Sequence, residues 1–172
     1  MGKHPIRPLA AVTLIVSVPV AVWGLLGRQD AAGFRPSELD YLVRPFDIPA
    51  GVETGLGVAA AVLAVAAATV LGLASRRPGP ERFDGRWWQV LGPLVAAGAL
   101  AGAGWRVVTA GGIGANIGAG LVILFGGPLV AALLAWSAGR GLWLARAGRR
   151  GPRPPRGGTG GAGWRPVPRE GV

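Results

Sequence analysis

The chain has no cysteine, one histidine and one lysine among its 172 residues. The absence of cysteine excludes disulfides, thiolate nucleophiles and cysteine-bound zinc or iron–sulfur centres. His4 lies beside the N-terminus, so we expect no histidine metal cluster and no Ser-His-Asp triad inside the fold. Lys3 is not preceded by a Walker motif. We therefore expect no metal, no cofactor and no enzymatic activity.

Charge is scarce as well. Charged residues make up 15% of the chain, compared with about 25% in soluble domains. Hydrophobic residues make up 51% and the mean hydropathy is +0.44. The apolar residues form long blocks and are not interleaved with polar ones as in an amphipathic helix of a soluble core. This pattern predicts an all-α membrane protein.

The uncharged stretches are residues 9–27, 54–75, 87–105 and 107–139. A helix needs about 20 apolar residues to cross a hydrocarbon core of about 30 Å. The last stretch is too long for one crossing and too short for two, and its glycine-rich start is typical of a connection. We predict helices over about residues 9–27, 54–75, 87–106 and 117–137, forming a four-helix antiparallel transmembrane bundle within residues 1–148.

The two ends of the chain need separate interpretations. Residues 9–27 follow Lys3 and Arg7, as a cleaved signal peptide would. However, signal peptides have apolar regions of about 7–15 residues, and no small-x-small cleavage site follows before Arg28. We predict a retained helix, with cleavage of residues 9–27 as a signal peptide as the alternative.

Residues 149–172 are rich in Pro, Gly and Arg, which predicts a disordered basic cytoplasmic tail.

Most of the 18 Lys and Arg residues lie on one side of this predicted topology. They precede the first helix, recur in residues 76–86 and continue through the C-terminal tail. The opposite side, which includes the loop 28–53, has only four arginines and five carboxylates. Because cytoplasmic loops retain Lys and Arg, we predict a multi-pass plasma-membrane protein with both termini in the cytoplasm. Anionic lipid headgroups at the inner face then account for the net charge of +10 without nucleic acid. The high content of Ala, Gly and Arg is typical of a bacterial genome rich in G and C.

Four polar residues lie at the outer ends of the predicted helices. They are Glu53, Arg106, Thr109 and Asn116. Consecutive antiparallel helices usually pack together, so we expect Glu53 to approach Arg106. The four residues form our candidate polar site. The alternatives are a purely structural ion pair and, for Asn116, a helix cap.

Glycine spacing predicts where the helices pack. Gly98 and Gly102 lie four residues apart in the third predicted helix, and Gly114 and Gly118 lie at the start of the fourth. Such spacing allows two helix backbones to approach closely. In the fourth helix Pro128 follows two glycines, which predicts a kink.

The sequence favours a small non-enzymatic membrane protein that acts as an accessory or interaction protein, with a membrane-protein partner or a second copy of itself. A small transporter or channel subunit is the alternative, for which Ser17, Thr69 and Asn116 are the few polar residues available within the spans. No paired carboxylates that could serve proton coupling occur there. A third interpretation is a membrane enzyme that uses the outer carboxylates Asp40, Asp47 and Glu53.

Overall fold

The computed structural model describes residues 6–30, 33, 35, 39, 41–76, 83–112 and 115–149, and within these residues it contains helices and no strand. Its segments that are long and apolar enough to cross a membrane are Ile6–Leu26, Ala50–Arg76, Gly85–Val108 and Asn116–Ala147. This confirms the all-helical class and the four long apolar helices. The predicted disordered tail lies outside the described residues, apart from Arg149.

The first three spans are each built around one long α-helix. These are α1 (Ile6–Leu26), α2 (Ala50–Arg76) and α3 (Trp88–Val108). A short 3-10 helix, η1 (Gly85–Trp87), leads into α3. The Asp84 carboxylate accepts a hydrogen bond of 3.0 Å from the Arg86 backbone N–H and so starts this turn.

The fourth span is interrupted. It consists of α4 (Ala115–Leu121), the π-helical segment η2 (Val122–Gly126) and α5 (Gly127–Arg149). The Gly127 N–H donates to the Val122 carbonyl, five residues earlier. Pro128 has no N–H to donate, and a widened turn is one way to accommodate a proline within a helix. The irregular segment therefore lies directly before the predicted kink.

The predicted end of the fourth helix at residue 137 is wrong, because α5 continues to Arg149. The prediction relied on where the apolar block ends. That boundary marks a change in polarity and not a loss of helix-forming residues, since Ala, Leu and Arg continue beyond it. A hydrogen bond of 2.8 Å from Arg140 Nε to Gln89 Oε1 also ties this extension to α3.

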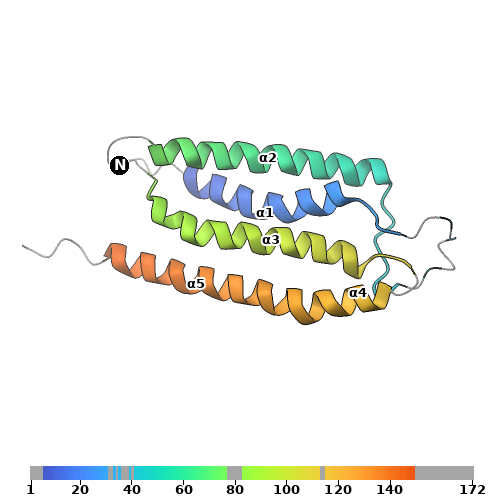
Figure 1. The fold of residues 1–172 in the computed structure, drawn as a ribbon. Helices are drawn as coiled ribbons and strands as arrows, with labels where there is room; N and C mark the ends of the chain where they lie inside the picture. The colour runs from blue at the N-terminus through green and yellow to red at the C-terminus, as the bar shows by residue number, and fades with distance from the viewer. Residues whose placement is uncertain are drawn as a thin grey trace, which may run out of the picture.

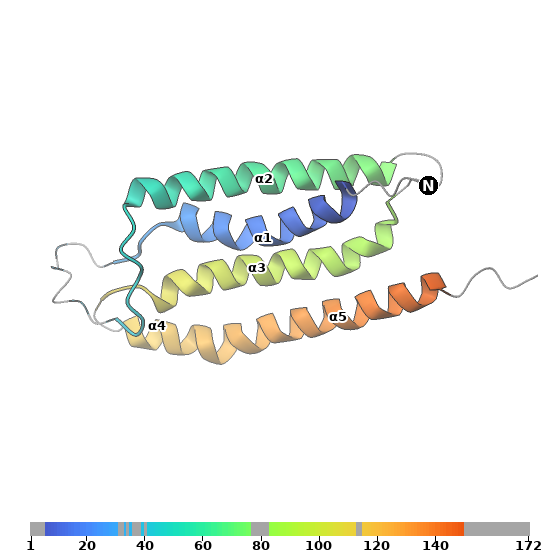
Figure 2. The same cartoon turned by 180° about the vertical axis from the view of Figure 1, so that it is seen from behind.

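The long helices lie side by side in the order α2, α1, α3, α5 (Figures 1 and 2). Helix α1 packs against both α2 and α3, whereas α5 packs against α3. The core cluster accordingly draws on all of the first three helices, through Ala10, Leu14, Ala67, Leu71 and Leu91. The expectation that consecutive helices pack together is therefore wrong for α2 and α3, because α1 lies between them.

Small residues let α1 occupy this central position. A Cβ added to Gly24 would lie 2.5 Å from the Cα of Gly57 in α2, and one added to Gly102 would collide with the Pro19 carbonyl oxygen. A Cβ on Gly98 would lie 3.1 Å from Pro19 Cδ. Gly98 and Gly102 thus face α1, across a close contact that only glycine permits.

The second predicted glycine pair is Gly114 and Gly118, and Gly118 makes a looser contact than Gly98 and Gly102 do. A Cβ on Gly118 would make an ordinary contact, 3.5 Å from Val107 Cγ1 in α3. Gly114 lies outside the described residues. The contact between Gly24 and Gly57 was missed in the sequence analysis, because these two glycines belong to different helices and have no characteristic spacing.

Candidate polar site at the meeting point of three helices

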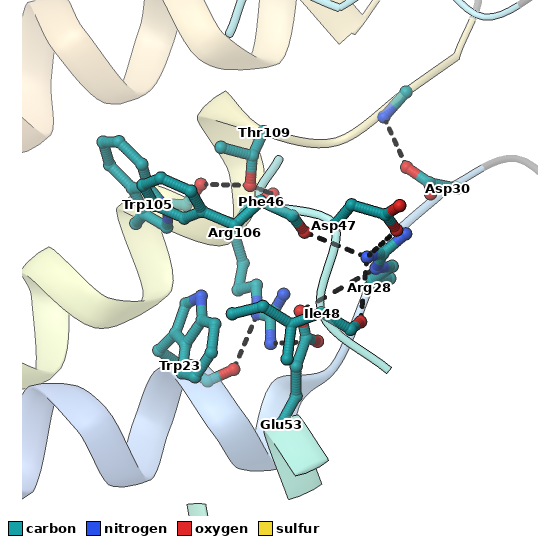
Figure 3. Close-up of polar contacts among 11 residues, drawn as sticks. Trp23, Arg28, Asp30, Phe46, Asp47, Ile48, Glu53, Trp105, Arg106 and Thr109 are labelled. Atoms are coloured by element: carbon teal, nitrogen blue, oxygen red, sulfur yellow. Dashed lines mark hydrogen bonds and ion pairs between the residues drawn. The ribbon is translucent and has the colours of Figure 1, made fainter. Parts of the chain in front are cut away.

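The candidate site lies where α1 and α3 end and α2 begins (Figure 3). Trp23 is in the last turn of α1, Glu53 is in the first turn of α2, and Arg106 is in the last turn of α3. Glu53 and Arg106 are each only 2% exposed. The structure therefore brings together the two charged residues predicted to meet, and buries both of them.

Arg106 connects the three helices. Its Nη2 donates to Glu53 Oε2 at 2.8 Å, and its Nε donates to the Trp23 carbonyl oxygen at 2.6 Å (Figure 3). Its guanidinium carbon lies 4.4 Å from the centre of the Trp23 ring, which adds a cation–π contact. Arg106 thus reaches past the end of α1 to contact α2, although α1 separates α2 from α3 over most of their length.

Helix electrostatics explains the placement of these charges. The last four carbonyls of a helix have no partner within it, and Trp23 supplies one of these in α1. A cation is favourable at this negative end of the helix dipole, and a carboxylate is favourable at the positive N-terminal end of α2. Arg106 and Glu53 therefore stabilise two helix ends as well as each other.

Arg28 is a third charged member, which the sequence analysis counted only toward the orientation. Its Nη2 donates to the carbonyl oxygens of Phe46 and Ile48, both at 3.0 Å, and its Nε lies 3.8 Å from Glu53 Oε1 (Figure 3). Asp47 Oδ1 lies 3.7 Å from the same guanidinium, but its side chain is fully exposed. The position of Arg28 at the edge of an uncharged block, in a loop rich in carboxylates, was the available signal.

Aromatic residues of the loop between α1 and α2 pack against α3 and the segment that follows it. Phe46 stacks on Trp105 of α3, with ring centres 6.4 Å apart. Earlier in the loop, the Tyr41 ring lies against Gly111 so closely that a Cβ there would collide with it. The Gly111 N–H donates to Asp30 Oδ1 at 3.0 Å. The loop is therefore fastened to the segment that joins α3 to α4.

The environment of Tyr41 affects its ionisation. Burial raises the pKa of Tyr41 above its ordinary value of 10.0, and the negative charge of nearby Asp30 raises this pKa further. Arg28 and Arg44 oppose the shift through their positive charges. The neutral phenol is therefore the form that the folded loop favours.

Thr109 and Asn116 differ from the two charged members. The buried Thr109 hydroxyl donates to the Trp105 carbonyl oxygen at 2.7 Å, so its hydrogen bond stays within α3 and its turn. Asn116 is exposed at the start of α4. The candidate site is thus a buried ion pair with Thr109 beside it, and Asn116 is not among its buried members.

Of the described residues considered for transport or catalysis, Glu53 is buried at this site and Asp47 lies at its exposed edge, beside Arg28. Ser17 is buried in α1, whereas exposed Thr69 donates to the Val65 carbonyl of its own helix. Asp47 is exposed while Glu53 is buried, and Asp40 lies outside the described residues. No group of three or more potential metal ligands occurs in the described part of the chain.

The buried polar side-chain atoms of the site have hydrogen-bond partners. Within the described residues, no buried side-chain nitrogen or oxygen atom is without a hydrogen-bond partner. A buried ion pair that is satisfied in this way is well suited to holding helix ends in place.

Comparison of the chain with protein-family models, with curated proteins and with solved structures found no match.

Proposed function

We propose that this chain is a small, non-enzymatic integral membrane protein that acts as an accessory subunit by binding another membrane protein. The observation that carries this proposal is the poor coverage of the fourth span. Only 6% of its apolar window is buried within the chain, compared with 28% for each of the other three spans. An apolar helix that its own chain covers so little is available for a partner helix.

The proposed partner surface lies in the outer half of this span. Ile117 and Leu121 are exposed, and their spacing of four residues places them on one face of α4, while Leu124 is exposed in the π-helical segment that follows. Phe125 is exposed beside them. A helix of the partner would contact this face through van der Waals packing, which is a main source of helix association in a bilayer.

The proposal includes a topology. The four apolar helices form an antiparallel transmembrane bundle in a bacterial plasma membrane, with both termini in the cytoplasm. Arg7, Arg76, Arg86, Arg140 and Arg146 support this orientation, since they belong to the helix ends on the side away from the buried ion pair. Lys and Arg are retained on the cytoplasmic side of membrane proteins, where they also face anionic headgroups.

The topology can be tested directly because the chain has no cysteine. We expect Gln29→Cys to react with a membrane-impermeant thiol reagent added to intact cells. Ala147→Cys should react only after the membrane is opened. Labelling of Ala147→Cys in intact cells would overturn the proposed orientation.

The accessory role is tested by purification from native membranes in a mild detergent, using a C-terminal tag and mass spectrometry. We expect one stoichiometric membrane-protein partner. Leu124→Ala should reduce its recovery several-fold, whereas Leu63→Ala, which truncates another exposed leucine on α2, should not. Loss of the partner in both variants, or recovery of the chain alone, would contradict the proposal. If a second, differently tagged copy of the chain is the only protein recovered, the exposed face of the fourth span would be assigned to self-association instead.

A further inference from the structure

A surface cavity of about 350 Å³ lies on the basic half of α5. It is lined by Ala135, Trp136, Gly139, Arg140 and Trp143. A Cβ added to Gly139 would meet no atom within 4 Å, so the space above this glycine is open. The depression is shallow and open, because all five residues that line it belong to one helix.

Arg140 is held in a defined position at this cavity. Its Nε donates to Gln89 Oε1 of α3 at 2.8 Å, and its guanidinium carbon lies 4.4 Å from the centre of the Trp143 ring. These contacts use the Nε edge and one face of the guanidinium, and not the terminal Nη groups. The Nη groups carry four of the five N–H donors of an arginine. Such a fork matches the geometry of a phosphate group.

The length of the fourth span places this cavity near the lipid headgroups. Asn116–Ala147 contains 32 residues, which corresponds to about 48 Å of helix, whereas the hydrocarbon core is about 30 Å thick. The basic end of the span therefore extends out of the core when the apolar end lies within it. Trp136 and Trp143 are exposed on either side of Arg140, and tryptophan is enriched at this boundary.

We propose that this cavity binds an anionic phospholipid. The lipid phosphate accepts hydrogen bonds from the Nη groups of Arg140, while its glycerol and first methylene groups lie against Ala135, Gly139 and Trp136. The fixed guanidinium distinguishes the cavity from the general basic surface at this end of the protein. This inference rests on the proposed membrane insertion and not on the proposed protein partner.

The test uses the full chain in a neutral detergent, titrated with phosphatidylglycerol or phosphatidylcholine, with bound lipid counted by native mass spectrometry. We expect phosphatidylglycerol to bind about tenfold more tightly, because both lipids carry the same phosphodiester but the choline cation of phosphatidylcholine compensates its charge and repels the Arg140 guanidinium. Arg140→Gln should reduce its affinity about tenfold. The control Arg146→Gln removes the same charge from an exposed position on the same helix and should change the affinity less than about twofold.

A second pair of variants tests the shape of the cavity. Gly139→Leu fills the open floor without a clash, so it should weaken binding of both lipids by several-fold. Gly120→Leu adds the same atoms at another open, exposed position of the fourth span and should have no effect. Equal losses in Arg140→Gln and Arg146→Gln, or in the two glycine variants, would overturn the proposal.

Two further outcomes separate the sources of failure. Displacement of bound phosphatidylglycerol by an equal concentration of inorganic phosphate would overturn a lipid site in favour of a simple anion site. Release of the protein from membranes by alkaline carbonate would refute the membrane insertion itself. Lipid binding that persists when no protein partner is recovered would support this inference and contradict the accessory role.

Discussion

The first three helices and the fourth span differ in how much of their surface the chain itself covers. Helices α1, α2 and α3 share an apolar core and a buried ion pair, whereas α5 packs along α3 and the 3-10 turn before it, through contacts that include Ser137 and Arg140. The buried share of the apolar window falls from 28% in each of the first three spans to 6% in the fourth. Burial within the chain is thus concentrated in α1–α3, while the fourth span leaves most of its apolar surface uncovered.

The largest expected effect comes from breaking the ion pair. Arg106→Met leaves the buried Glu53 carboxylate with only the more distant Arg28, 3.8 Å away, so we expect a loss of about 3–5 kcal/mol in unfolding free energy. The double variant Glu53→Leu/Arg106→Met should regain part of this loss, because no uncompensated charge remains. Denaturation in detergent micelles, followed by tryptophan fluorescence, measures both.

The control is Arg146→Met in the fourth span, where an exposed arginine should contribute less than about 0.5 kcal/mol. A double variant that loses the sum of its two single losses would show that Glu53 and Arg106 are not coupled. Equal effects of Arg106→Met and Arg146→Met would remove the distinction between the two regions.

A smaller effect is expected at the contact between α1 and α2. Gly57→Ala places a Cβ within 2.7 Å of the Gly24 backbone, which should cost about 1–3 kcal/mol. Gly55→Ala, two residues earlier and open to its surroundings, should be neutral or stabilising by up to about 1 kcal/mol. The same unfolding measurement applies. Equal destabilisation by both would refute the close contact.

Ser137 provides a weaker test on the fourth span. Its Oγ lies 3.3 Å from the Val90 carbonyl oxygen of α3 and 2.8 Å from that of Leu133 in its own helix. We expect Ser137→Ala to cost about 0.5–1 kcal/mol and to speed amide hydrogen exchange in α5. Thr69→Ala, which removes a hydroxyl that bonds only within α2, should leave exchange in α5 unchanged.

The smallest effect concerns pH and the loop. The pKa of Tyr41 is raised on folding, so the neutral phenol stabilises the folded state. This contribution to the unfolding free energy is fully present below pH 10.0 and is lost as the pH rises through the higher folded pKa. The unfolding free energy should therefore fall slightly as the pH rises above about 10. Tyr41→Phe should remove this fall; an unchanged pH dependence in that variant would assign it to other groups.

Much of the helical structure could be predicted because it depends on local composition. The uncharged blocks predicted all four long helices, and charges at block ends identified Glu53 and Arg106 as a pair. The end of α5 was missed because apolarity reports where a helix leaves the hydrocarbon core, whereas helix formation continues as long as the residues permit it.

The expected Glu53–Arg106 contact does occur, but not for the expected reason. We expected α2 to pack along α3. Instead, α1 lies between them, and Arg106 reaches around the C-terminal end of α1. Arg28 joins the cluster through two backbone carbonyls of the loop that lie 18 and 20 residues away in the chain, too far for a local sequence pattern to predict.

By itself, the sequence determined the number, the approximate extent and the apolar character of the helices, since these follow from residues that are close together in the chain. Only the tertiary structure decided the order α2, α1, α3, α5 and the contacts of Gly24 with Gly57 and of Gly102 with Pro19. These depend on which helix surfaces can approach most closely. That choice is made between residues far apart in the chain, so local composition does not determine it.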